Sequence, residues 1–231
     1  MNPQTASGRT PCTIISNGLR HAQVTSQCLQ RVVLILDRSG SMKEDNKARD
    51  ASAATAGLCQ ELALPVNKAG FEVAVIHFSN RAKLIHPFES ASTLVGHLQP
   101  LRVSFFGGET DLTAGLELAC ELLQTAEASP ARAALRYIKP LTVVMSDGGH
   151  NHGPGPAPAA KKLKEIADVL AVAFGDDADQ AMLEAIATEQ LSVRCRTGAD
   201  LRCYFAQMGR TLTVTRTAGT SATAALTHRQ F

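Results

Sequence analysis

Short apolar runs recur along the chain, separated by turn residues and polar segments. The runs at 32–36 and 141–145 are rich in Val, Leu and Ile, which predicts strands buried on both faces. The run at 82–87 follows an Asn-Arg turn, which predicts a hairpin with the strand before it. The predicted strands are 32–36, 71–78, 82–87, 141–145, 169–174 and 191–195.

Segments with helical spacing lie between these runs. In the first of them Ala51, Ala54 and Leu58 recur on one face, and Pro65 ends the pattern. Strands that alternate with helices predict an α/β fold with a doubly wound, mainly parallel sheet. We expect one antiparallel strand at its edge and helices on both faces, a Rossmann-like arrangement. The predicted helices are 44–64, 90–98, 112–126, 161–168, 179–188 and 199–212.

The two ends of the chain lack this pattern. Residues 1–30 mix Pro and Gly with polar residues and are predicted to be an N-terminal extension. Its apolar patch at 13–15 leaves a short edge strand and simple disorder as open alternatives. Residues 213–231 are mostly Thr, Ala, Ser and Gly, which predicts a flexible C-terminal tail. The domain itself is expected to span residues 31–212.

The composition of the chain argues against several classes of partner and binding site. The 231 residues carry a net charge of +2 and no basic run, which argues against a nucleic-acid partner. The chain has 6 cysteines and no C-x-x-C motif, so a zinc ribbon is not expected, while disulfides stay open. No stretch has the length of a membrane span and no apolar signal segment opens the chain, so we expect a cytoplasmic protein that binds no membrane.

Candidate chemistry begins where the first predicted strand ends. Asp37, Ser39 and Ser41 follow it at every second position, and Gly40 allows the chain to bend between the serines. One carboxylate and two hydroxyls are hard oxygen ligands, which suit Mg²⁺ or Mn²⁺. A plainer interpretation is a strand-to-helix turn in which Ser41 or Asp45 only caps the next helix.

Two distant stretches favour the metal interpretation. Thr110 lies in a glycine-led loop just before the predicted helix 112–126, and Asp147 ends the predicted strand 141–145. In doubly wound sheets, ligands bind outside the carboxyl ends of the strands. All of these oxygen-bearing side chains are expected at that edge.

This set of residues resembles the metal-ion-dependent adhesion site (MIDAS) of von Willebrand factor A domains, which have an integrin I-like fold. The family pattern is D-x-S-x-S, then a threonine in a G-T-[DN]-L-like loop, then an aspartate in a T-D-G-like turn. The resemblance covers roughly residues 30–212, and Glu109, between the glycine pair and the threonine, is the one departure. The pattern maps onto Asp37, Ser39, Ser41, Thr110 and Asp147.

The resemblance implies a protein-binding function. Two aspartates balance the charge of a divalent cation, and neutral hydroxyls leave it electrophilic. A Glu or Asp of a partner protein would then complete the coordination of Mg²⁺ or Mn²⁺. The resemblance also implies that Thr110 binds the metal directly in an open form and through water in a closed form. We therefore expect a binding module and no enzyme.

The D-R-S-G-S-M core and the single-domain layout further resemble stand-alone bacterial members, the TerY-like proteins of tellurium resistance. Their relatives work with kinases, phosphatases or MoxR-type AAA+ ATPases in stress-response or defence systems, so a regulatory subunit of such an ATPase is one alternative. A metal-dependent hydrolase is another, with Asp111, His150 and His152 as the acid–base candidates near the site. A third is a structural subunit whose metal only stiffens the loops.

Overall fold

The computed structural model describes residues 28–67, 70–97, 108–127 and 136–227. Most of the predicted N-terminal extension, residues 1–27, lies outside the described residues, so its edge strand is not tested. Residue 98, the predicted end of a helix, and residues 228–231 also lie outside them.

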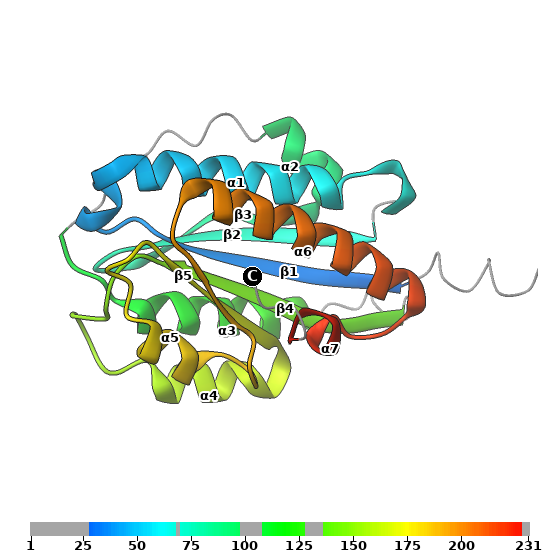
Figure 1. The fold of residues 1–231 in the computed structure, drawn as a ribbon. Coiled ribbons are helices and arrows are strands. Elements are labelled where there is room, and N and C mark those ends of the chain that lie inside the picture. The colour runs from blue at the N-terminus through cyan, green and yellow to red at the C-terminus, as the bar shows by residue number, and fades with distance from the viewer. Residues whose placement is uncertain (1–27, 68–69, 98–107, 128–135, 228–231) are drawn as a thin grey trace, which may run out of the picture.

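One six-stranded sheet forms the centre of the molecule, in the order β3-β2-β1-β4-β5-β6 (Figure 1). Neighbouring strands pair in parallel except β2 and β3, which form an antiparallel hairpin at one edge. The predicted fold class is confirmed. The strands are β1 (Cys28–Asp37), β2 (Phe71–Phe78), β3 (Ala82–Ser90), β4 (Arg136–Ser146), β5 (Asp168–Phe174) and β6 (Ser192–Cys195).

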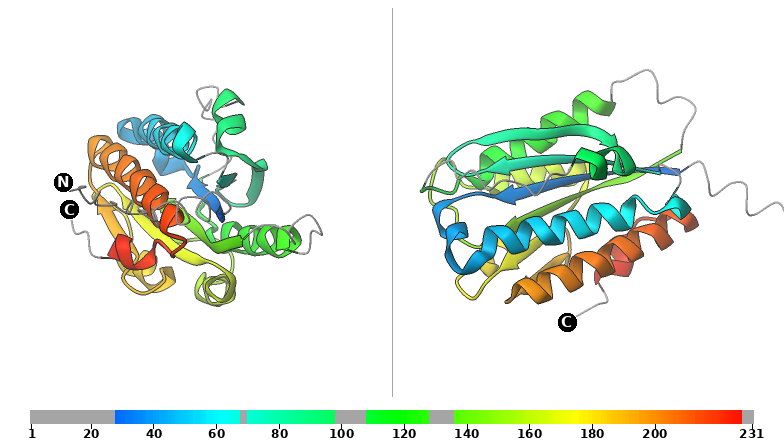
Figure 2. Two further views of the ribbon diagram at one scale, coloured as in Figure 1. Left: turned by 90° about the vertical axis from the view of Figure 1, so that its right-hand side faces the viewer. Right: turned by 90° about the horizontal axis from the view of Figure 1, so that it is seen from above.

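Helices cover both faces of this sheet (Figures 1 and 2). Those on one face are α1 (Lys47–Leu62), α2 (Ala91–His97), α6 (Gly198–Ala218) and α7 (Thr223–Thr227), and those on the other are α3 (Leu112–Glu127), α4 (Ala157–Ile166) and α5 (Gln180–Ile186). Two 3₁₀ helices, η2 (Gly40–Asn46) and η3 (Pro65–Asn67), flank α1. Within the described ranges, no helix is both long and apolar enough to cross a membrane.

The central strand β1 is buried on both faces, as its apolar run predicts. Leu34 and Leu36 pack toward α1 and α6, whereas Val33 and Ile35 pack toward α3 and α4. Full burial of such a side chain contributes about 1.5–3 kcal/mol. The strand is therefore a firm support for the side chains at its carboxyl end.

Helices α1 and α6 lie side by side, as the view from above in Figure 2 shows. A Cβ atom on Gly209 of α6 would lie only 2.6 Å from the Cβ of Glu61 on α1, so the absence of a side chain permits this close approach. The packing of α1 against α6 fixes the position of α1 on the sheet.

Strand β4 begins before the predicted position, at Arg136. Its proline, Pro140, has no N–H to give to the ladder, and the register with β1 shifts between Gln30 and Val32 at this point. The irregularity lets a proline lie inside a central strand. The strand is thus longer at its start than the predicted 141–145.

The prediction of a flexible tail from 213 is wrong for residues 213–227. Helix α6 continues to Ala218, because Leu212, Thr215 and Arg216 are buried against the rest of the molecule. Its threonine hydroxyls donate to carbonyls one turn back, such as Thr215 to Thr211 O at 3.0 Å. Arg216 is buried and donates to the Cys28 carbonyl at 3.2 Å. Leu226 of α7 joins the core. A composition rich in Thr and Ala conceals this packing.

Candidate metal centre

The candidate site lies where β1 and β4 end side by side in the middle of the sheet. The chain leaves β1 toward α1 on one face and leaves the loop after β4 toward α4 on the other. Connections that diverge in this way open a crevice at the carboxyl ends of the two strands. Asp37 is the last residue of β1, and Asp147 directly follows β4.

Asp37 is fully buried and held by two donors. The backbone N–H of Ser39 donates to its Oδ1 at 2.7 Å, and the hydroxyl of Ser146 donates to its Oδ2 at 2.5 Å. Burial raises the pKa of Asp37 to about 6, even though both hydrogen bonds act to lower it. A neighbouring positive charge would relieve this cost of burying a carboxylate.

Asp147 and the two serines of the motif form a continuous chain of side-chain contacts. The Ser41 hydroxyl donates to Asp147 Oδ1 at 2.8 Å, and Ser41 Oγ lies 3.1 Å from Ser39 Oγ. Asp147 is also fully buried. Together with the bond from Ser39 to Asp37, these contacts bring four of the five predicted ligands into one network.

Thr110 reaches the same edge by a different route. Its backbone N–H donates to Asn151 Oδ1 at 2.7 Å, and the Asn151 N–H donates back to the Thr110 carbonyl at 3.1 Å. Asn151 belongs to the loop that follows Asp147, so this pair ties the two loops together. Thr110 is buried, but among the described residues no hydrogen bond joins its hydroxyl to the other four predicted ligands.

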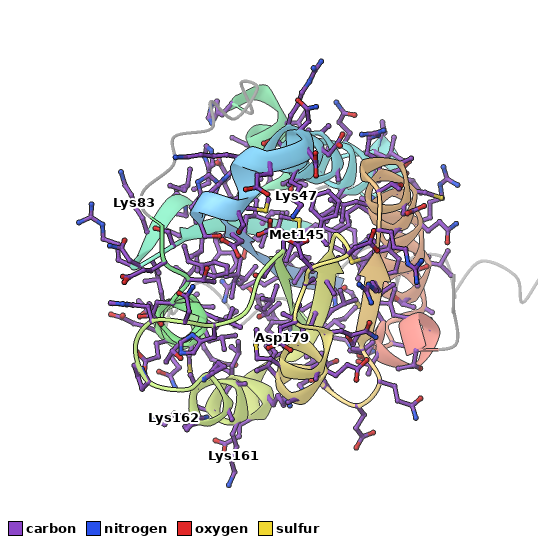
Figure 3. The ribbon with its side chains drawn as sticks, turned by 60° about the vertical axis from the view of Figure 1, so that its left-hand side comes forward. Lys47, Lys83, Met145, Lys161, Lys162 and Asp179 are labelled. Carbon is purple, nitrogen blue, oxygen red and sulfur yellow. The ribbon has the colours of Figure 1, made fainter. Side chains whose placement is uncertain are left out.

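Lys47 is the most prominent residue at the site that the sequence did not reveal. Its Nζ donates to Asp147 Oδ2 at 2.9 Å and to the two Asp177 oxygens at 2.9 and 3.0 Å. Burial acts to lower the pKa of Lys47, but the hydrogen bonds to both carboxylates outweigh it and raise that pKa, so the ammonium stays charged. Figure 3 labels Lys47 at the start of α1 and Met145 on the neighbouring strand β4.

Ser146 and Asn151 were also missed. A hydroxyl directly before Asp147 was a usable signal for Ser146, because it occupies the threonine position of the T-D-G-like turn. The sequence offers no comparable signal for Asn151, which acts through a backbone contact between distant loops.

The three acid–base candidates all make contacts that hold loops. His150 Nδ1 accepts the Leu112 N–H at 3.2 Å, and Asp111 Oδ1 accepts the Ala114 N–H at 3.1 Å, so both cap the first turn of α3. His152 pairs with Glu109 at 2.8 Å. Asp111 therefore acts as a helix cap in this structure.

The donor set fits a hard divalent cation. It offers two buried carboxylates and three hydroxyls, one of which belongs to Thr110 and has no partner within the described residues. No group of three or more His, Cys, Asp and Glu suited to a metal occurs in the described part of the chain. The candidate site depends on hydroxyl oxygens, which soft-metal ligand sets do not use.

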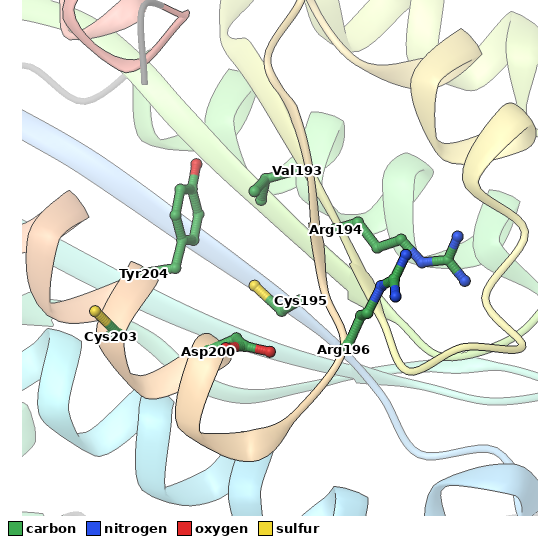
Figure 4. A pocket seen from close by; sticks show the side chains of 7 residues that line it. All are labelled: Val193, Arg194, Cys195, Arg196, Asp200, Cys203 and Tyr204. Carbon is green, nitrogen blue, oxygen red and sulfur yellow. The ribbon is translucent and has the colours of Figure 1, made fainter. Parts of the chain in front are cut away.

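A separate cavity of about 240 Å³ lies between β6 and the start of α6 (Figure 4). Cys195, Cys203 and Tyr204 are among its lining residues. Both cysteines are free thiols, as are the other three cysteines of the described residues. Burial raises the pKa of Cys195 to about 12, so this thiol is not a nucleophile at neutral pH.

Family comparison agrees with the fold. The von Willebrand factor type A domain family matches residues 32–202, and the chain therefore belongs to this family. Comparison with curated protein sequences gives no match.

Solved structures with the same fold come from organisms as different as a mussel and bacteria. Proximal thread matrix protein 1 from the mussel byssus superposes with a TM-score of 0.65 at 22% identity, over 78% of this chain and 47% of that one. A von Willebrand factor type A protein from Catenulispora acidiphila gives a TM-score of 0.66 at 19% identity, over 80% and 43%. BatB from Bacteroides thetaiotaomicron gives 0.58 at 18%, over 83% and 100%.

The chain spans less than half the length of the first two of these proteins. At such identities the likeness shows the fold alone. One structure of the mussel protein has a zinc-occupied MIDAS motif.

Proposed function

We propose that this chain is a protein-interaction module that binds its partner through a divalent cation. The main support for this proposal is the hydrogen-bond network at the ends of β1 and β4, which brings together two buried aspartates and two serines. Membership of the von Willebrand factor type A family supports this proposal, because the family contains metal-dependent interaction modules.

Each predicted ligand has a role in this proposal. Asp37 and Asp147 supply the two negative charges, and three hydroxyls complete the set without adding charge. Bound there, Mg²⁺ or Mn²⁺ would supply an electrophilic centre that accepts a carboxylate oxygen from a Glu or Asp of the partner protein. The proposed ligands are Asp37, Ser39, Ser41, Thr110 and Asp147.

A binding role suits the site better than hydrolysis. Asp111 and His150 both accept backbone N–H groups at the start of α3, and His152 pairs with Glu109, so each of the three acid–base candidates already holds a loop in place. We infer a module without enzymatic activity.

The cellular setting is a finer proposal, supported only by the D-R-S-G-S-M core and the layout of the chain. We propose a cytoplasmic bacterial protein of the TerY-like type, with a role in stress response. Its partner would be a kinase, a phosphatase or an AAA+ ATPase of the MoxR type that presents an acidic side chain.

Calorimetric titration with MgCl₂ and MnCl₂ tests the metal step. We expect one site in the wild type and loss of binding in Asp37→Asn, which keeps the shape of the side chain and removes its charge. Equal affinity in the two proteins would contradict the proposal.

Capture of proteins from a host lysate tests the partner step. Wild type and Thr110→Ala are compared in Mg²⁺ and in EDTA, with Thr93→Ala as the control because Thr93 has an exposed hydroxyl contact far from the site. A partner retained by wild type and Thr93→Ala only in Mg²⁺ supports the proposal. Identical capture under all conditions would oppose it.

A further inference from the structure

Lys47 places a fixed positive charge against a proposed metal ligand. Its side chain is 9% exposed, and its Nζ lies 2.9 Å from Oδ2 of the fully buried Asp147. The other oxygen of that carboxylate accepts the Ser41 hydroxyl. One carboxylate therefore faces the ligand network with one oxygen and an ammonium group with the other.

A second carboxylate shares the ammonium. Asp177, in the loop after β5, accepts from Lys47 through both oxygens, and its side chain is 58% exposed. It is not one of the proposed ligands. The charge of Lys47 is thus divided between a buried carboxylate at the site and an accessible carboxylate outside it.

The backbone before Lys47 is bent to hold it there. Asp45 and Asn46 both have left-handed conformations, with φ of 49° and 59°, which Asp and Asn adopt more readily than other residues with a side chain. The short segment η2 therefore has a proposed ligand, Ser41, near its start and delivers the Lys47 ammonium directly after its end.

The loop after β5 is also shaped around the ammonium. Gly175 has φ of +98°, and a Cβ atom there would lie 2.9 Å from Asp177 Oδ1 and 3.3 Å from Lys47 Nζ. Any other residue would be strained in its backbone and would displace the pair. Two separate loops thus accommodate one lysine.

We propose that Lys47 is a tethered cation that competes with the divalent ion for Asp147, and that Asp177 sets the strength of this competition. The inference rests on the proposed metal site. A positive charge beside a ligand opposes the binding of a divalent cation, and burial limits the screening of this repulsion by salt. The negative charge of Asp177 offsets part of the positive charge of Lys47 and so weakens the repulsion between Lys47 and the divalent cation.

Competition for Asp147 and a purely structural ion pair predict different effects of replacing Lys47. A structural pair would lower the melting temperature equally with and without metal when Lys47 is replaced, and the dissociation constant for metal would not change. Competition predicts that replacement lowers stability in EDTA and enlarges the stabilisation by Mg²⁺.

The test is calorimetric titration with MgCl₂ of wild type, Lys47→Gln, Asp177→Asn and the double variant, with melting temperatures in EDTA and in Mg²⁺. We expect Lys47→Gln to bind Mg²⁺ roughly tenfold more tightly and Asp177→Asn to bind it several-fold more weakly. In the Lys47→Gln background, Asp177→Asn should have a much smaller effect. Asp176→Asn is the matched control, because its carboxylate faces Arg194 and Arg196 at 3.8 Å and makes no contact with Lys47.

Each outcome of these titrations supports or overturns the competition between Lys47 and the metal. Unchanged or weaker Mg²⁺ binding by Lys47→Gln, or equal affinities of Asp177→Asn and Asp176→Asn, would overturn the role of Lys47 and leave the metal site in place. Absence of Mg²⁺ binding by the wild type would overturn both proposals. If Lys47→Gln does not fold, Asp177→Asn at its exposed position still decides the case.

Discussion

The two halves of the candidate site are built differently. In the β1–β4 half, the side chains of Ser39, Ser41 and Asp147 are joined by hydrogen bonds at the ends of two central strands, and the Ser39 backbone N–H adds the Asp37 carboxylate. In the other half, the hydrogen bonds that hold Thr110 within the described residues come from its backbone alone, through the side chain of Asn151 and the Asn151 N–H.

We infer from this difference that one half of the site is fixed and the other can shift. The β1–β4 half is preorganised, because its carboxylates are buried on a sheet that cannot move without disrupting the core. The Thr110 loop can shift by exchanging a few backbone contacts, as the two arrangements implied by the family resemblance require. Changes in the first half should remove metal binding or stability, whereas changes in the second should weaken binding and spare the fold.

The largest effect is expected from Asp37→Asn. Loss of one of two ligand charges should reduce Mg²⁺ affinity by a factor of about 100 or more, measured by calorimetry. The pKa of Asp37 is raised to about 6, so the buried charge costs stability at pH 7 and its removal should not lower the melting temperature in EDTA. A collapse of the fold in EDTA would contradict this account of the preorganised half.

Ser146→Ala should destabilise that half next most strongly. The hydroxyl donates to the buried Asp37 carboxylate, and such a bond contributes about 2 kcal/mol. Urea unfolding in EDTA measures the loss. Thr142→Val on the same strand is the control, because the Thr142 hydroxyl is buried without a partner and its removal should be neutral or stabilising. Equal losses in the free energy of unfolding of the two variants would show that the hydrogen bond from Ser146 to Asp37 does not stabilise the fold.

Thr110→Ala should weaken Mg²⁺ binding by roughly tenfold, or about 1.4 kcal/mol. The side chain makes no hydrogen bond with the described residues, so the free energy of unfolding in EDTA should stay within about 0.5 kcal/mol of wild type. Calorimetry and urea unfolding of the same preparation check both statements. Unchanged Mg²⁺ affinity would remove Thr110 from the ligand set.

Asn151→Ala should have the smallest effect, a loss of a few-fold in Mg²⁺ affinity. The Asn151 side chain does not belong to the proposed ligands, and it acts only by holding the Thr110 backbone. Combined with Thr110→Ala it should add little, because both changes act on the same ligand. Additive losses in the double variant would contradict the role of Asn151 in holding Thr110.

The parts that the sequence predicts well are those set by local pattern. The apolar run of β1 marks a strand buried on both faces, and the polar residues directly after it mark where that strand ends. The alternation of strands and helices then places Asp37 and Asp147 at the same edge. The structure confirms this fold and brings the two carboxylates into one network.

The remaining features depend on contacts between distant segments. Helix α1 begins at Lys47 and not at 44, because Asp45 and Asn46 adopt left-handed conformations that no periodic pattern reveals. The bridge from Lys47 to Asp177 joins residues 130 positions apart. Arg216 is buried through its bond to the Cys28 carbonyl, so a segment that looks like a tail by composition is part of the core.

Anomalous diffraction from crystals grown with MnCl₂ tests the central claim most directly. The account predicts one strong peak at the carboxyl ends of β1 and β4, within coordination distance of side-chain oxygens from Asp37, Ser41 and Thr110 or of waters bound to them. A peak elsewhere, or no peak at saturating Mn²⁺, would contradict the claim that these residues form a divalent-cation site.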